Sequence, residues 1–376
     1  MEIYLDNSAT TKPCSLAVSK AEYTMTECYG NPSSLHEKGL SAERLLEDTR
    51  EIIAKSLSAE KSEIFFTPSG TVANNTAIFG AVNALKRRGN KIVTTAFEHP
   101  SVQRCMDKLA EDGFEVVRLT PDSDGNISVQ KFENAVDENT ILVSVMAVNN
   151  ETGSILPFDK IKKIIKKKNS PALLHIDAVQ AYMKIPLKPA VTGADFISMS
   201  AHKIHGLKGA GALYKNKAVR IKPYILGGGQ ENNICSGTQS LPAIAAFGGA
   251  VEAFGSTNQR LEAVRELNLY LRQKTSKTDG IEINSPENAL PYIINLSLSK
   301  IPSQVSVNYF SMNGIYISAG SACSKGHRSD TLVSMGLSPE RIDTAVRVSL
   351  SYETTREEID EFVKTAEKAL SELRKK

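Results

Sequence analysis

Short apolar runs alternate with helical stretches through the first two thirds of this 376-residue chain. The runs are too short to be helices and are bounded by turn residues, as strands are. Because two parallel strands must be joined by a crossover, strands that alternate with helices favour a mostly parallel sheet covered on both faces. The sequence therefore predicts an α/β, doubly wound, mostly parallel seven-stranded sheet, with strands at residues 64–67, 91–96, 115–119, 141–148, 173–176, 196–199 and 212–214.

The pattern of the chain changes after residue 254, where strands and helices no longer alternate. The last predicted helix starts with a capping box, in which Thr355 and Glu358 can each satisfy a backbone N–H of the other. This segment predicts a smaller α+β unit, with helices at 259–274 and 355–375 and strands at 292–298 and 315–318.

We expect two domains, as the length of the chain suggests. The large domain comprises residues 15–254. The small α+β domain combines residues 1–14 with 255–376, and it carries a loop that contains Cys323.

Composition and charge narrow the class of protein. There are 45 basic and 42 acidic residues, so the net charge of +3 does not favour nucleic acid or a membrane surface as a partner. The lysine-rich stretch 160–168 is interpreted as the solvated face of a helix with Ile161, Ile164 and Ile165 packed inward; an anionic partner is the alternative. The start of the chain is not a signal peptide and no apolar run is long enough to span a bilayer, so we expect a cytoplasmic protein.

The five cysteines stand far apart, at Cys14, Cys28, Cys105, Cys235 and Cys323. No two of them have the spacing of a CxxC metal or redox site, and their odd number argues against a disulfide framework. The histidines near residue 203 have no acidic ligands at helical spacing, so we expect no metal site.

Two polar tetrads follow two of the predicted strands directly. Asp177 and Gln180 belong to the first, and Ser200, His202 and Lys203 to the second. The carboxyl ends of parallel strands are where open α/β sheets bind their ligands. A lysine with an acid nearby suits pyridoxal 5'-phosphate (PLP), because the amine binds the cofactor's aldehyde and the carboxylate keeps the pyridine nitrogen protonated. The alternatives are a surface lysine, and a carboxylate paired with a buried arginine or lysine.

Three further elements follow strands in the same way. Gly70 and Thr71 open a helix where backbone N–H groups and the helix dipole would favour a phosphate. His99 could stack on an aromatic ring, and Asn150 could donate to a ring hydroxyl. Alone, each is more typical of an ordinary turn, cap or loop residue. Their joint order along the chain makes the cofactor site the stronger interpretation.

The last third of the chain adds a thiol and a cation. Cys323 lies in a loop of small residues, and Lys325, His327 and Arg328 would favour its thiolate. A tolerated surface cysteine is the alternative. Arg347 interrupts an apolar strand and needs an anionic partner, for which a substrate carboxylate and a structural salt bridge are nearly equal candidates.

With these motifs the chain resembles the cysteine desulfurases, PLP enzymes of fold type I and aminotransferase class V. The resemblance covers essentially the whole length. It includes the segments 4–11 and 29–34, the order of the polar elements above, the Ser-Ala-Cys at 321–323 and the strand around Arg347.

The resemblance implies a homodimer that converts L-cysteine to L-alanine and leaves the sulfur as a persulfide on Cys323. Sulfur-acceptor proteins of iron–sulfur cluster assembly or thiolation would take it on. Lys203 would bind PLP and move protons, and His99 would stack on the ring. Asp177 would pair with the pyridine nitrogen. The remaining implied contacts are Gln180 and Asn150 at the ring hydroxyl, Gly70, Thr71, Ser200 and His202 at the phosphate, Thr238 at the phosphate across the dimer interface, and Asn31 and Arg347 at the substrate carboxylate.

Three places depart from the family's pattern: Pro68 lies inside the phosphate turn, the loop after Cys323 is slightly short, and the segment 232–239 differs. Residues 232–235 are Asn-Asn-Ile-Cys where relatives have basic residues, and Gln239 replaces an acidic residue. Three other functions stay open: a selenocysteine lyase, a small-substrate aminotransferase, and a non-catalytic scaffold that docks sulfur-transfer proteins.

Overall fold

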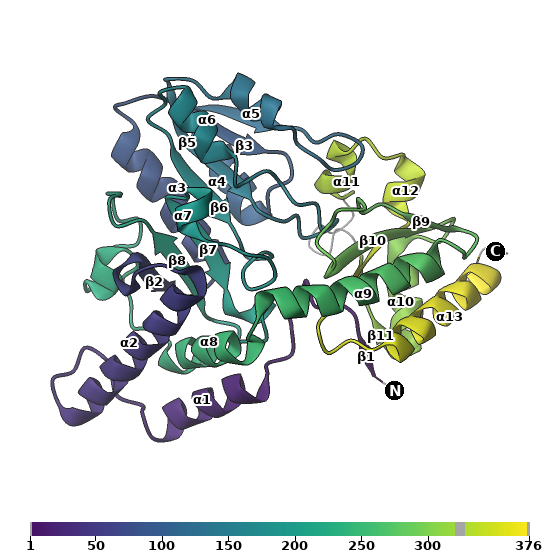
Figure 1. The fold of residues 1–376 in the computed structure, drawn as a ribbon, viewed down its shortest axis with the longest axis horizontal. Coiled ribbons are helices and arrows are strands. Elements are labelled where there is room, and N and C mark those ends of the chain that lie inside the picture. Colours follow the sequence, from purple (N-terminus) through teal and green to yellow (C-terminus); the bar gives the residue numbers. More distant parts are fainter. Residues whose placement is uncertain (1, 320–327, 374–376) are drawn as a thin grey trace.

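The computed structural model describes residues 2–319 and 328–373 of the chain. A seven-stranded sheet and a four-stranded sheet lie side by side, and a two-stranded pair accompanies the smaller one (Figure 1). Both chain termini lie at the end of the molecule that holds the smaller sheet.

The large sheet has the strand order β2-β8-β7-β6-β5-β3-β4. Only β8 runs against its neighbours, so the prediction of a mostly parallel seven-stranded sheet is confirmed. The central strands are buried along almost their whole length because helices cover both faces, which explains their continuous apolar runs. The strands are β2 (Ile64–Thr67), β3 (Lys91–Thr95), β4 (Glu115–Leu119), β5 (Thr140–Met146), β6 (Leu173–Asp177), β7 (Phe196–Ser200) and β8 (Gly211–Lys215).

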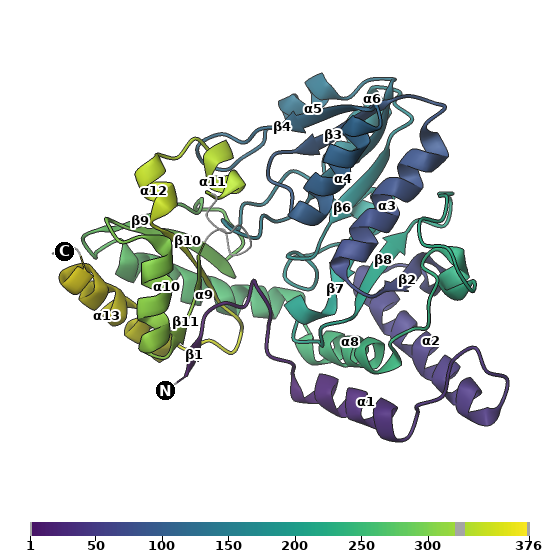
Figure 2. The same ribbon diagram turned by 180° about the vertical axis from the view of Figure 1, so that it is seen from behind.

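Helices cover the two faces of this sheet. The helix α3 crosses β5 to β8 and packs beside α4; both are nearest the viewer in Figure 2. The opposite face carries α6 and α7, which are nearest in Figure 1. In α6, Ile161, Ile164 and Ile165 are buried, as expected from the sequence. The helices are α3 (Gly70–Leu85), α4 (Pro100–Glu111), α5 (Val129–Ala135), α6 (Ile161–Lys167) and α7 (Pro189–Thr192).

Three longer helices pack together near β2, at the end of the large sheet. They are α1 (Ser15–Thr26), α2 (Glu37–Leu57) and α8 (Leu241–Phe254). Three short 3-10 turns complete this part: η1 (Lys61–Glu63), η2 (Ala201–Lys203) and η3 (Gln230–Asn233). Within the described residues, no helix is both long and apolar enough to cross a bilayer.

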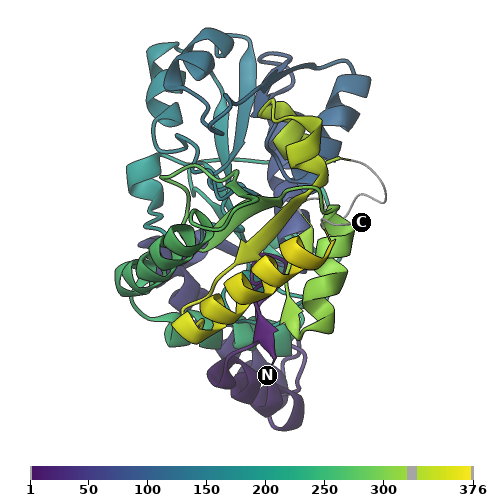
Figure 3. The same ribbon diagram turned by 90° about the vertical axis from the view of Figure 1, so that its right-hand side faces the viewer.

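The smaller sheet is antiparallel, with the order β12-β13-β10-β9. Figure 3 looks at it from the side on which α9 and α13 lie in front. The capping box is present, with Thr355 N–H donating to Glu358 Oε2 and Glu358 N–H to Thr355 Oγ1. The elements are β9 (Ile281–Ile283), β10 (Ile293–Leu298), β12 (Ser318–Ala319), β13 (Ala345–Ser349), α9 (Thr257–Thr275), α10 (Ser303–Met312), α11 (Asp330–Ser334), α12 (Pro339–Asp343) and α13 (Arg356–Leu373).

The prediction of a single strand at 315–318 is wrong. The structure has two strands there, and they belong to different sheets. β11 (Ile315–Tyr316) pairs in parallel with β1 (Ile3–Tyr4), whereas β12 pairs with β13. The chain changes partner at Ile317, and a local apolar pattern carries no information about which strand will lie beside it.

The geometry of the large sheet gathers the polar segments that follow its strands. β2 and β7 both run against β8, so β2 points the same way as the parallel strands. The carboxyl ends of β2, β3, β5, β6 and β7 therefore share one edge. In the register, Met146 of β5 lies beside Asp177 of β6, which lies beside Ser198 of β7.

Candidate active site

A pocket of about 560 Å³ lies at this edge. Residues of the large sheet's loops form most of its wall, and the smaller unit contributes Arg347 and residues 328–331. The structure thus brings together most of the predicted site residues: Gly70, Thr71, His99, Asn150, Asp177, Gln180, Ser200, His202, Lys203 and Arg347.

Lys203 ends the short turn η2, directly after β7. Its Nζ donates to the backbone carbonyls of Ser8, at 2.5 Å, and Ala9, at 2.8 Å. Both carbonyls belong to the N-terminal segment, which also lines the pocket. The amine is therefore anchored at the pocket wall by neutral acceptors.

Asp177 is 4% exposed at the end of β6. Its Oδ1 accepts from the Val179 N–H at 3.0 Å and its Oδ2 from Asn74 Nδ2 at 2.8 Å. No lysine or arginine among the described residues forms an ion pair with it, so the alternative of a buried structural pair is not what the structure has. A carboxylate can accept about four hydrogen bonds, which leaves room for a protonated ring nitrogen.

The pocket also holds buried polar atoms that have no partner within residues 2–319 and 328–373. They are Ser8 Oγ, Asn74 Oδ1, Glu98 Oε2 and Arg347 Nε, all from residues that line it. Buried polar groups without partners are rare in folded proteins, and a polar ligand would satisfy them. Together with the lysine and the acid, these atoms make the pocket a chemical fit for PLP.

A phosphate would fit at the start of α3. Ser69 caps this helix, and Gly70 is its first residue. A Cβ on Gly70 would lie 2.7 Å from a methyl group of Val179, and one on Gly211 only 2.6 Å from the backbone of Ser69. Glycine at these positions lets the segment after β6 and the start of β8 pack tightly against the turn, and the free N–H groups of the helix favour an anion.

The two histidines of the site act as neutral rings. Burial lowers the pKa of His99, and Lys203 lowers it further against the opposing effect of Asp177. Burial also lowers the pKa of His202 to about 3, with Lys203 the next cause. Each ring is therefore a hydrogen-bonding group at neutral pH and not a cation.

Two acids of the pocket, the buried Glu98 and the half-buried Glu151, escaped the sequence analysis. Burial raises the pKa of Glu98 to about 8 and that of Glu151 to about 7. Glu98 Oε1 accepts from Thr95 Oγ1 and from the Met146 N–H, and Glu151 Oε2 accepts from Ser329 Oγ at 2.5 Å. Each acid is the direct sequence neighbour of a predicted site residue that follows a strand. This position in the sequence could have identified both acids.

A buried lysine was also missed. Lys184 is 3% exposed, and its Nζ lies 3.4 Å from Gln180 Oε1 and over the ring of Tyr292. Burial lowers its pKa to about 7, helped by the charges of Lys203 and Arg347. Only its spacing of four residues from Gln180 hints at this contact in the sequence.

Arg347 has one of the two partners considered from sequence, the structural salt bridge. Its Nη2 forms an ion pair with Asp6 Oδ1 at 2.9 Å, and its Nη1 donates to the Asn150 carbonyl. It also lines the pocket. The structural salt bridge therefore exists, at a place where Arg347 can still meet a ligand.

Two predicted site residues of the described part of the chain are not brought to the pocket. Asn31 and Thr238 are exposed and do not line it. The Asn31 side chain accepts from the Ser33 N–H. Cys323 lies outside the described residues.

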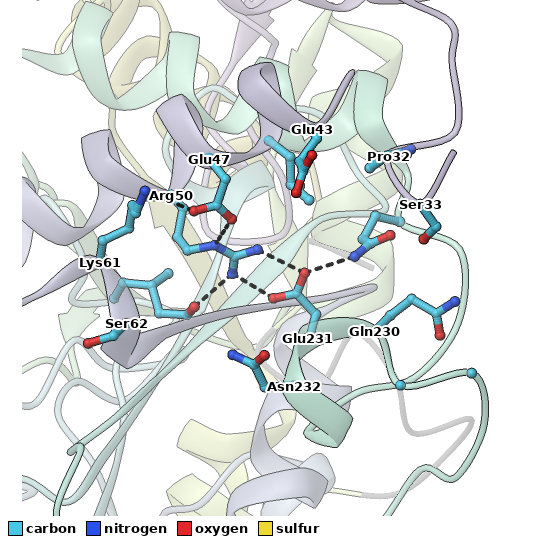
Figure 4. A pocket seen from close by; sticks show the side chains of 15 residues that line it. Pro32, Ser33, Glu43, Glu47, Arg50, Lys61, Ser62, Gln230, Glu231 and Asn232 are labelled. Atoms are coloured by element: carbon cyan, nitrogen blue, oxygen red, sulfur yellow. Dashed lines mark hydrogen bonds and ion pairs between the residues drawn. The ribbon is translucent and has the colours of Figure 1, made fainter. Parts of the chain in front are cut away.

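A second pocket, of about 490 Å³, adjoins the segment that departs from the family's pattern (Figure 4). Arg50 and Glu231 form a two-pronged ion pair beside it, at 2.6 and 3.0 Å. Glu231, Asn232 and Asn233 all have positive φ, a conformation that asparagine tolerates better than most residues.

The glutamine at position 239, where relatives have an acid, also has a structural explanation. Its amide nitrogen donates to Glu231 Oε1 at 3.1 Å, where a carboxylate would repel Glu231. The departures in this segment therefore follow from local backbone and charge, and Cys235 within it is buried away from both pockets.

Comparisons with known proteins agree with this site. The aminotransferase class-V family matches residues 3–362. A Clostridium botulinum protein named cysteine desulfurase IscS is 36% identical over 99% of this chain and 95% of its own. A solved NifS-like protein has a TM-score of 0.93 and 37% identity, over 99% of this chain and all of that one. SspA, solved in complex with cysteine, has a TM-score of 0.83 and 30% identity, over 94% of this chain and all of SspA.

The site and the comparisons lead to one assignment. A lysine and an acid face a pocket with unsatisfied polar atoms, in a fold shared over nearly the whole chain with cysteine desulfurases. The chain belongs to the aminotransferase class-V family of PLP enzymes, and within it to the cysteine desulfurases.

Proposed function

We propose that this protein removes the sulfur of L-cysteine, releases L-alanine and holds the sulfur as a persulfide on Cys323. The observation that carries the proposal is the joint presence of Lys203 and Asp177 in the wall of one pocket. When bound there, PLP draws electrons from the substrate carbon next to the carboxylate and so makes its neighbouring bonds labile. The relative solved with cysteine supports this substrate.

Residues of the pocket would hold the cofactor's ring. Lys203 Nζ binds the aldehyde, and Asp177 keeps the ring nitrogen protonated. Gln180 and Asn150 contact the ring hydroxyl, and His99 stacks on the ring. Gln180 already donates one amide hydrogen to the Ser8 carbonyl at 2.9 Å, and its second hydrogen is available for the ring oxygen.

The phosphate is held at the start of α3. Gly70 and Thr71 offer backbone and side-chain donors, and Ser200 and His202 close the other side. Thr238 is exposed in a single protomer, and we assign it to the phosphate of the partner in a homodimer.

Arg347 receives the substrate carboxylate. Its guanidinium has a buried Nε without a protein partner among the described residues, while Asp6 and the Asn150 carbonyl hold the other nitrogens in place. We assign Asn31 as the second ligand of the carboxylate. Lys203 would be the base that takes the Cα proton of the substrate and later returns it.

Cys323 completes the reaction as a thiolate. It attacks the sulfur of the substrate, forming a sulfur–sulfur bond as the carbon–sulfur bond breaks. The electron pair of the broken bond stays with the substrate carbon, which takes up a proton and leaves as part of alanine. The persulfide then passes to a sulfur-acceptor protein of iron–sulfur cluster assembly or thiolation.

The same proposal includes the organisation of the protein. Residues 15–254 form the large domain, and residues 1–14 with 255–376 form the small one; the pairing of β1 with β11 supports placing the N-terminus there. The protein is a homodimer of the cytoplasm.

The test is single-turnover desulfuration. The protein with PLP and cysteine should yield one alanine and one persulfide per site, and peptide mapping should place the persulfide on Cys323. The Cys323→Ser variant should lose persulfide formation, whereas Cys14→Ser, a half-exposed control, should not. Sulfide release at an unchanged rate from Cys323→Ser would refute the role of Cys323, and transamination without sulfur release would favour an aminotransferase.

A further inference from the structure

A hydrogen-bonded chain of four side chains runs along one wall of the pocket. It starts at Asp177 and passes through Asn74 and Ser101 to His99. All four line the pocket, and Asn74 is only 1% exposed on the inner side of α3. The cofactor contacts proposed above involve only the two ends of this chain, Asp177 and His99.

Asp177 fixes the orientation of the Asn74 amide. A carboxylate offers only acceptors, so the amide must turn its nitrogen toward Asp177 Oδ2, at 2.8 Å. The second hydrogen of the same nitrogen points to Ser101 Oγ, at 2.9 Å. A flipped amide would bring an oxygen against the carboxylate and lose the bond to Asp177, and it would draw the Ser101 hydrogen away from His99.

The amide in turn fixes the Ser101 hydroxyl. Because Ser101 Oγ accepts from Asn74, its own hydrogen is left for His99 Nδ1, which lies 2.8 Å away. The Ser101 backbone N–H donates to the same ring nitrogen at 3.1 Å. A nitrogen that accepts two hydrogen bonds cannot carry a proton, so the proton of the neutral ring is on Nε2.

We infer that Asn74 and Ser101 are positioning residues that set the tautomer of His99 from the charge of Asp177. The inference rests on the proposed function, since it leaves His99 with an Nε2–H donor in the pocket where the cofactor and substrate would meet. Neither residue needs to touch the reacting atoms. Asn74 also holds Asp177 in place for the ring nitrogen of the cofactor, so one amide orients both the acid and, through Ser101, the histidine.

The charged and titratable groups around His99 are consistent with a neutral ring. They are Asp177 from β6, which favours the imidazolium, and Lys203 from η2, which disfavours it. Burial is the largest influence and lowers the pKa of His99. Glu98 precedes His99 in the chain, and burial raises its pKa to about 8, so it brings no full charge at pH 7.

The experiment is nitrogen NMR of ¹⁵N-histidine-labelled protein, with and without PLP. His99 is assigned by its loss in His99→Gln. In the wild type, His99 should show an unprotonated Nδ1 and a protonated Nε2. Ser101→Ala and Asn74→Leu should raise the pKa of His99 by about one unit, because a bond to the neutral ring is weakened. Ser101→Thr, which keeps the hydroxyl, should restore the wild-type value.

Thr76→Val is the matched control. Thr76 lies on the same helix, is fully buried and has a hydroxyl without a partner in the described part of the chain, so its loss should leave His99 unchanged. A protonated Nδ1 in the wild type would overturn the inference without any variant. An unchanged His99 pKa in both Ser101→Ala and Asn74→Leu would also overturn it. The measurement on the cofactor-free protein is independent of whether cysteine is desulfurated, so it separates this inference from the proposed function.

Discussion

Arg347 and Asp6 form an ion pair across 341 positions of the chain, with 2.9 Å between Nη2 and Oδ1. The pair joins β13 to the N-terminal segment whose carbonyls hold Lys203. Asp6 thus ties Arg347, which we propose as the residue that receives the substrate carboxylate, to the segment that holds the Lys203 amine. The guanidinium at the pocket is held in place by the structural salt bridge, one of the two partners that the sequence left open.

Replacing Arg347 by lysine tests this arrangement. A lysine keeps the charge but cannot serve Asp6, the Asn150 carbonyl and a carboxylate ligand at once. The Arg347→Lys variant should raise KM for cysteine about tenfold or more, the equivalent of one lost charged hydrogen bond, and lower kcat less. Arg341→Lys, outside the pocket, should leave KM unchanged in the same steady-state assay. An unchanged KM in Arg347→Lys would remove Arg347 from the substrate site.

The ion pair of Arg50 and Glu231 predicts a large effect on stability. Both groups are mostly buried, and Glu231 also accepts from the Phe66 N–H at 2.8 Å, just before the turn proposed for the phosphate. Glu231→Gln leaves a buried guanidinium without its main partner and should cost about 3 kcal/mol of the free energy of unfolding.

Glu47 provides the matched control for that variant. It pairs with the same arginine but its side chain is 37% exposed, so Glu47→Gln should cost less than about 1 kcal/mol. Urea unfolding monitored by circular dichroism compares the two. Equal losses would show that Glu231 does not anchor the segment of positive φ that follows it.

The lowered pKa of Lys184 predicts that the stability of the protein depends on pH. Its pKa is about 7 in the folded protein and its ordinary value is 10.5, so between these limits the unfolded chain binds more protons. Stability should therefore rise with pH from about 7 to 10.5, as the cost of keeping this amine uncharged disappears.

Lys184→Met should remove that contribution. The variant should be more stable than the wild type at pH 7, by an amount on the order of a few kcal/mol, and the difference should shrink toward pH 10. The exposed Lys188→Met serves as the control and should follow the wild type. Urea unfolding at several pH values measures the free energy of unfolding of each protein. Parallel plots of this free energy against pH for Lys184→Met and wild type would contradict the prediction.

The sequence predicted the large sheet well because its strands are buried on both faces. Such strands are continuous apolar runs, and polar residues placed directly after them must meet at one edge. Asp177, His99 and Lys203 were found for that reason. The strand at 315–318 failed because its two halves pair with different strands, and pairing depends on residues far along the chain.

The inner parts of the site could not be predicted for a related reason. Asn74 is a polar residue within an apolar helix, and only the fold shows that Asp177 lies 2.8 Å from it. Asp6 and Ser8 reach the site because β1, just before them, pairs with β11 from the last third of the chain. Contacts between residues 103 or 341 positions apart leave no local pattern in a single sequence.

The most direct test of the account is the identity of the lysine that carries the cofactor. Borohydride reduction of the PLP-loaded protein should fix the cofactor to one amine, and peptide mapping should place it on Lys203. Lys184 is an internal competitor, since its lowered pKa makes it a good nucleophile close to the pocket. A label on Lys203 alone is the predicted result; a label on Lys184 or another lysine, or none in cofactor-loaded protein, would contradict it.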